Sequence, residues 1–260
     1  MFLSNICSRI FGSFAKTCFP TPIQEFINSV YVRIFRINLD EFETTRFKNL
    51  NALFTRRLKT KRTFDMSPTQ LISPTDSLIT ESALTTEGKA LQIKSMQYSI
   101  SELLGENLDC DFFYLNFYLS PRDYHRYHAP CDLEIEEIRY FGGCLRPVNM
   151  PSLMRVQNLF VKNERIVVKA KMPNGKKIYF VAIGALNVGS IIFHCEPKIK
   201  TNAKRANQTY TYVTPIKVAK GDELGMFEMG STIVLFIQDF TPNVATQQIV
   251  KFAQNIGYIN

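Results

Sequence analysis

Two histidines lie in the short polar stretch LSPRDYHRYH at residues 119–128, and a Gly-Ser-Thr sequence occurs far downstream at 230–232. A serine hydroxyl becomes a nucleophile when an imidazole lies beside it and a carboxylate orients that imidazole. Ser231 precedes a run of β-branched, leucine and aromatic residues that is typical of a buried strand. Because Gly230 leaves its carbonyl open to approach, the Gly230–Ser231 bond is a candidate for attack by the protein's own serine. A simple tight turn into a core strand is the other interpretation of these residues alone.

The wider sequence around both stretches narrows this choice. Residues 220–232, KGDELGMFEMGST, resemble the processing site of phosphatidylserine decarboxylases, and residues 119–128 are similar to the LSPRDYHRxH signature of that family. Smaller blocks of the chain also resemble the family, namely Phe54–Leu58, Ser73–Asp76, 147–149, 159–165 and 188–191. The resemblance runs from about Val30 to Phe236 and is to the pyruvoyl-dependent, bacterial membrane-associated type.

The resemblance implies a particular chemistry. Asp76, His128 and Ser231 correspond to the self-cleavage triad, in which the histidine takes the proton of the serine and the aspartate fixes the imidazole tautomer. Cleavage at Gly230–Ser231 without hydrolysis would leave a β chain, 1–230, and an α chain, 231–260, associated as a heterodimer. Ser231 would become a covalent pyruvoyl cofactor, which serves as the electron sink for decarboxylation of phosphatidylserine to phosphatidylethanolamine.

Other polar residues in the signature have less defined roles. The resemblance assigns His125 to the decarboxylation step, either as an acid or as a group that orients the substrate carboxylate. Arg122 and Arg126 suit a carboxylate or phosphate partner and equally suit structural salt bridges. We expect His194 to be structural. No metal site is predicted, because the His-x-x-His pair lacks further ligands at a suitable spacing and the six cysteines include no C-x-x-C pair.

Charge and hydrophobic patterning predict a membrane partner. The 260-residue chain has a formal charge of +8 and a pI of about 9.2, which favours an anionic partner. Residues 2–19 have an apolar helical face and no acid, a pattern typical of an interfacial helix and also of a helix docked on the protein's own core. Residues 44–64 contain seven Lys or Arg and no acid. Nucleic acid is not predicted, since no recognised motif accompanies the charge. We expect peripheral attachment to the cytoplasmic side of the cell membrane.

The fold is predicted to be α+β, with a mainly antiparallel β core and an amphipathic helical N-terminal region. We expect residues 1–64 to form the membrane-associating region and residues 65–260 the catalytic domain. Strands are expected at 111–119, 188–194 and 209–218, and a hairpin around Pro173–Gly175. Because the triad falls in the β-rich part, self-cleavage should not require residues 2–19.

Two other functional classes are compatible with parts of this sequence. A serine hydrolase could use Asp76, His128 and Ser231 on an external ester or peptide, although Ser231 lies outside any Gly-x-Ser-x-Gly motif. A non-enzymatic basic membrane adaptor would account for the N-terminal region but not for the histidine-containing stretch. Only a self-cleaving enzyme requires the release of a C-terminal fragment with a blocked amino terminus.

Overall fold

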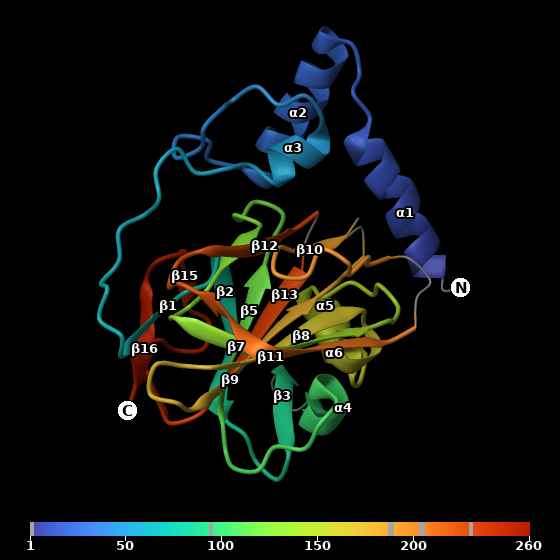
Figure 1. The fold of residues 1–260 in the computed structure, drawn as a ribbon. Coiled ribbons are helices and arrows are strands. Elements are labelled where there is room, and N and C mark those ends of the chain that lie inside the picture. Colours follow the sequence, from blue (N-terminus) through green and yellow to red (C-terminus); the bar gives the residue numbers. More distant parts are fainter. Residues whose placement is uncertain (1–2, 94–95, 187–189, 203–205, 229–230) are drawn as a thin grey trace.

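A computed structural model describes residues 3–93, 96–186, 190–202, 206–228 and 231–260. A β-rich body carries a group of three helices from the first part of the chain at one end (Figure 1). The α+β class and the antiparallel core agree with the prediction from sequence.

The helices are α1 Leu3–Lys16, α2 Thr21–Phe35, α3 Leu50–Phe54, α4 Ile100–Leu104, α5 Met150–Arg155 and α6 Leu159–Lys162. The strands are β1 Gln70–Ile72, β2 Ser77–Leu84, β3 Lys89–Ile93, β4 Met96–Ser99, β5 Phe113–Leu119, β6 Arg126–His128, β7 Leu133–Phe141, β8 Arg165–Lys171, β9 Lys177–Ile183, β10 Ile191–Phe193, β11 Gln208–Val218, β12 Glu223–Phe227, β13 Ser231–Ile237, β14 Phe240–Pro242, β15 Ile249–Val250 and β16 Asn255–Ile259.

Strand β13 lies within the largest sheet, which has the antiparallel order β11-β7-β8-β9-β13-β5-β2-β15. Ile233 and Leu235 enter one hydrophobic cluster, whereas Val234 and Phe236 enter another on the opposite face. A strand that is buried on both faces needs no polar alternation. The double burial explains why the sequence after Ser231 is continuously apolar, and it holds the start of β13 on a rigid support.

A smaller sheet, with the order β10-β12-β6, joins the second histidine to the strand that precedes the predicted cleavage bond. Tyr127 of β6 lies opposite Gly225 of β12. A Cβ atom at Gly225 would lie 2.0 Å from the carbonyl oxygen of Ile192 in β10, so a side chain larger than hydrogen would separate these strands.

The predicted strands and hairpin are largely confirmed. Strands β8 and β9 pair antiparallel around the turn at Pro173–Gly175, where Gly175 has a φ of +77°. The strands expected at 111–119 and 209–218 correspond to β5 and β11. The strand expected at 188–194 is present as β10, with residues 188–189 lying outside the described part of the chain.

Helix α1 contacts the protein along part of its apolar face. Ala15 is buried and Phe11 is half-buried, and both pack in a cluster with residues of α3. Ile10 and Phe14 are 66% and 43% exposed. The helix therefore docks on the protein with part of its apolar face and presents other apolar side chains to solvent, and its role as an interfacial helix stays a prediction.

Helix α2 has its apolar side outward. Its buried residues are polar: the Gln24 amide donates to Asn28 at 2.9 Å, and the Asn28 amide donates to the Phe47 carbonyl at 2.8 Å. Its exposed apolar residues are Ile23, Phe26, Val30 and Ile34. This orientation is the reverse of that of an ordinary surface helix, and exposed apolar patches mark interaction surfaces. No helix in the described ranges is long and apolar enough to cross a bilayer.

Candidate active site

The turn between β5 and β6 is shaped by its own side chains. The carboxylate of Asp123 accepts hydrogen bonds from the backbone N–H and the hydroxyl of Ser120, each at 2.7 Å. Arg56, just after α3, is only 3% exposed and donates to the carbonyl oxygens of Arg122 and Asp123 at 2.6 and 3.0 Å. The Ser-Pro-Arg-Asp part of the signature is therefore a self-capped turn, and the helical region fixes it to the β-rich body.

His125 is completely enclosed. Its Nδ1 lies 2.8 Å from the carbonyl oxygen of Asp123, which can only accept, so Nδ1 carries the proton. Within the described ranges its Nε2 has no hydrogen-bond partner. The ring of Phe54 packs against the imidazole, with 3.9 Å between ring centroids. Burial, and then the charge of Arg56, lower the pKa of His125 to about 3, so this imidazole is neutral at physiological pH.

His128 is held by contacts on several sides. Its Nδ1 lies 3.1 Å from the carbonyl oxygen of Gly221 and is therefore the protonated nitrogen, so its Nε2 accepts from the hydroxyl of Tyr124 at 3.1 Å. The ring of Phe252 stacks on the imidazole at 3.8 Å with an interplanar angle of 18°. Burial lowers the pKa of His128 to about 4. The imidazole is thus neutral, and its basic nitrogen faces Tyr124.

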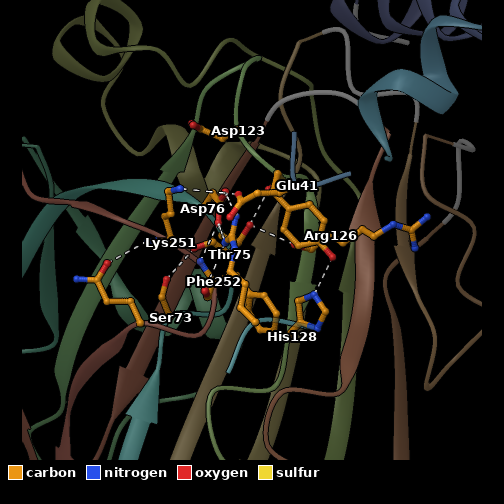
Figure 2. Close-up of polar contacts among 12 residues, drawn as sticks. Glu41, Ser73, Thr75, Asp76, Asp123, Arg126, His128, Lys251 and Phe252 are labelled. Carbon is orange, nitrogen blue, oxygen red and sulfur yellow. Dashed lines mark hydrogen bonds and ion pairs between the residues drawn. The ribbon is translucent and has the colours of Figure 1, made fainter. Parts of the chain in front are cut away.

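The carboxylate of Asp76 is bound to groups other than His128 (Figure 2). It pairs with Arg62 at 2.5 and 3.1 Å and accepts the backbone N–H of Phe252 at 2.8 Å. No hydrogen bond joins Asp76 to His128 in the part of the chain that the structure describes. The two residues are linked indirectly, because the residue whose N–H binds Asp76 is also the residue whose ring covers His128.

The predicted cleavage bond is only partly described. Gly230 lies outside the described residues, and for Ser231 the structure describes the backbone. Ser231 is the first residue of β13 and pairs with Leu119, the last residue of β5. On the other side of the bond, the N–H of Phe227 donates to the carbonyl oxygen of His125 at 2.9 Å. Both chain segments that lead to Gly230–Ser231 therefore contact the stretch 119–128.

Comparison with known proteins agrees with this geometry. The family model described as phosphatidylserine decarboxylase matches residues 50–258. The chain is 57% identical to the phosphatidylserine decarboxylase proenzyme of Helicobacter pylori (strain ATCC 700392 / 26695), over 98% of this chain and 97% of that protein. It is 42% identical to the protein of the same name from Campylobacter jejuni, over 99% of this chain and 100% of that protein. The chain belongs to the phosphatidylserine decarboxylase family.

The two arginines of the signature and His194 differ in their contacts. Arg126 donates to Glu223 at 2.6 Å and to the Thr55 carbonyl at 2.9 Å, and His194 bonds the same Glu223 oxygen at 2.8 Å. Arg126 is therefore engaged in a buried structural salt bridge, and His194 contributes to it from the surface. Arg122 is exposed, 3.9 Å from Asp123.

Several residues around the two histidines were not foreseen from the sequence. They are Arg56, Arg62, Tyr124, Gly221 and Phe252. The two arginines belong to the basic run 44–64, which we expected to form a surface, and they turn inward to bind the site instead. Tyr124 was inside the signature and could have been singled out there, whereas nothing in the local sequence distinguishes Phe252.

A cavity of about 240 Å³ opens beside His128. Its lining includes His128, Tyr124, Phe252 and two cationic residues, Arg57 and Lys61. Small molecules can therefore approach His128 from this side. In the described ranges no cluster of three or more potential metal ligands is present.

Proposed function

We propose that this chain is a pyruvoyl-dependent enzyme that decarboxylates phosphatidylserine to phosphatidylethanolamine, after it has cut itself at Gly230–Ser231. The observation that carries the proposal is the position of the stretch 119–128 against both sides of that bond. The names of the relatives, which are decarboxylase proenzymes, support the substrate and the processing step.

Self-cleavage would use His128 as the base. Its neutral imidazole is held by Gly221 through Nδ1, and the lone pair on Nε2 accepts from the Tyr124 hydroxyl. That lone pair would take the proton of the Ser231 hydroxyl once the hydrogen bond from Tyr124 opens. The Ser231 oxygen bonds to the carbonyl carbon of Gly230 while the C–N bond breaks, and the proton passes to the freed amine. Loss of the α-proton of Ser231 then expels the Gly230 carboxylate. Uptake of water and release of ammonia convert the resulting dehydroalanine into the pyruvoyl group.

Asp76 would support this base through Phe252. The Asp76 carboxylate fixes the Phe252 backbone, and the Phe252 ring limits how the imidazole of His128 can tilt. Arg62 keeps the carboxylate in place by a bidentate contact. The triad assignment of Asp76 therefore stands as a proposal in which its influence on His128 is indirect.

His125 would act in the later step. A buried polar atom without a partner is uncommon in proteins and suits a group whose partner is supplied by the reaction. The Nε2 atom of His125 is unprotonated in this tautomer and can accept a hydrogen bond or a proton in an enclosed space, and the carbonyl of Asp123 fixes the ring through Nδ1. The pyruvoyl group at residue 231 would supply the electron sink for loss of the carboxyl group, and the unpartnered nitrogen of His125 fits such a group.

Intact-mass measurement tests the proposal. The purified protein should consist of a fragment of residues 1–230 and a fragment that begins at residue 231 with a pyruvoyl group in place of an amino terminus. Ser231→Ala should remain one chain and should release no carbon dioxide from phosphatidylserine. A wild-type protein that stays uncut and hydrolyses an ester would instead favour a serine hydrolase, and division of the Ser231→Ala chain would refute the chemistry.

The proposed partner of the helical region is an anionic membrane surface on the cytoplasmic side. The exposed apolar residues of α1 and α2 support insertion at the interface, and each exposed cation of the basic run would add roughly 1 kcal/mol near anionic lipid. The double variant Phe26→Ser/Ile34→Ser should sediment less with phosphatidylserine-containing vesicles and should still cut itself. Unchanged sedimentation would show that α2 is not the contact.

A further inference from the structure

The carboxylate of Glu228 joins three segments that are distant in sequence. One oxygen accepts hydrogen bonds from Lys16 Nζ at 2.7 Å and from the Ser190 hydroxyl at 2.5 Å. The other oxygen accepts from the Asn51 amide at 3.3 Å. The backbone N–H of Glu228 also donates to the Ser190 carbonyl at 2.9 Å. With its side chain only 10% exposed, Glu228 is a buried anion that depends on these donors.

The place of Glu228 in the chain makes these contacts relevant to cleavage. It follows the last residue of β12 directly and stands two residues before Gly230. The preceding residue, Phe227, is bound to the backbone of His125. Because Ser231 already belongs to β13, only three residues connect the two strands. The contacts of Glu228 therefore restrict the direction in which the chain leaves β12 toward the cleavage bond.

Lys16 connects this anchor to helix α1. It lies in the last turn of the helix, and its carbonyl oxygen accepts from the Asn49 amide at 2.9 Å. Asn49 is the N-cap of α3, where its side chain accepts the N–H of Ala52. The ammonium group of Lys16 therefore reaches Glu228 only while the end of α1 is docked against α3.

We propose that Glu228 is a positioning residue for self-cleavage and that Lys16 makes this positioning depend on the docking of helix α1. The inference rests on the proposed cleavage at Gly230–Ser231. Without Lys16 the Glu228 carboxylate keeps two neutral hydrogen-bond donors but loses its only cationic donor among the described residues. Its free energy is then lower when it turns toward water than when it stays buried. The backbone at Glu228 then loses its fixed direction. Residues 2–19, which we expected to be dispensable for cleavage, thus contribute to it.

The test follows the division of newly made chains in cell-free synthesis on a denaturing gel. Lys16→Met should lengthen the half-time of cleavage about tenfold, and Glu228→Ala at least as much. The charge exchange Lys16→Glu/Glu228→Lys should restore part of the rate, which loss of packing alone would not produce. Lys171→Met is the matched control, because Lys171 is also half-exposed and also pairs with a glutamate, Glu136, at 2.7 Å, but at the end of strand β8. It should cleave at the wild-type rate.

The outcomes separate this inference from the proposed function. If the wild-type chain does not divide, the proposed function fails. If the wild type divides and Lys16→Met and Glu228→Ala divide equally fast, the positioning role is refuted and the proposed function stands. Unfolding midpoints in an uncut Ser231→Ala background complete the test. Lys16→Met should lower the midpoint only slightly, because the freed Glu228 carboxylate can turn toward water, and a slow variant with a large fall in midpoint would indicate a general structural role instead.

Discussion

His125 and His128 are three residues apart in the sequence, yet different regions of the molecule surround them. The helical region encloses His125, through the ring of Phe54 and the guanidinium of Arg56, which holds the turn before it. The β-rich body encloses His128, through Gly221 and Phe252. His128 has both ring nitrogens hydrogen-bonded, whereas one nitrogen of His125 has no partner in the described chain. The structure thus gives the two imidazoles different surroundings, which fits our proposal that each serves a separate step. It also places residues of the helical region against His125.

Replacing each histidine should have the largest effect and should separate the two tasks. His128→Ala removes the proposed base for Ser231 and should slow cleavage by about a hundredfold or more. His125→Ala should still allow cleavage, and the processed enzyme should lose most of its decarboxylase activity. Gel analysis of newly made chains and carbon dioxide release measure the two steps separately. Equal effects of both substitutions on both steps would remove the distinction between the histidines.

Acid should destabilise the fold through both imidazoles. Each has a native pKa below the ordinary value of 6.5, so the unfolded state binds more protons as the pH falls below 6.5. Stability is then fully present at pH 7 and declines by about 1.4 kcal/mol per pH unit for each histidine until the native pKa is reached. In the Ser231→Ala background, His128→Gln should therefore reduce the loss of unfolding free energy between pH 7 and pH 5 by about 2 kcal/mol. A pH dependence unaffected by this substitution would mean that His128 is not held neutral.

Phe54→Leu should affect the surroundings of His125 more than those of His128. Phe54 is 1% exposed, and a smaller side chain leaves space beside the imidazole at a cost of about 1.5 kcal/mol in unfolding free energy. Decarboxylation should fall, and cleavage should continue at close to the wild-type rate. Phe252→Leu provides the matched change on the other side and should show the opposite pattern, with slower cleavage. Identical patterns for the two variants would contradict the separation of the two regions.

Tyr124→Phe should have the smallest effect. It removes one hydrogen bond, the one to Nε2 of His128, while the ring that packs beside Phe42 and Phe252 remains. This hydrogen bond occupies the lone pair that would take the Ser231 proton, and its loss is worth about 1 kcal/mol, so cleavage should become faster by a factor of about five. Rates of cleavage measured between pH 6 and pH 8 give the comparison with the wild type. Complete loss of cleavage would instead assign the Tyr124 hydroxyl a direct part in moving the proton.

Local sequence determined those elements whose formation depends on neighbouring residues. The apolar run after Ser231 forms β13 because it can be buried on both faces, and Pro173–Gly175 closes a hairpin because Gly175 accepts a positive φ. The turn at 120–123 is likewise capped by its own serine and aspartate. The hydrophobic pattern was sufficient to predict the α+β class, and the sequence motifs were sufficient to predict the family, whereas the site residues stay a prediction.

Only the tertiary structure decided which distant groups surround the site. Asp76 binds Arg62 and the Phe252 backbone because the basic run and the C-terminal segment meet there, and no local pattern marks either contact. The pairing of Lys16 with Glu228 spans most of the chain. Amphipathic periodicity shows that α2 has two faces but not which one is buried; Gln24 and Asn28 find partners inside, so the apolar face is left outside. The physical reason is common to all three: a charge or an amide is satisfied by whatever partner the fold brings within hydrogen-bonding distance, and sequence spacing does not report that distance.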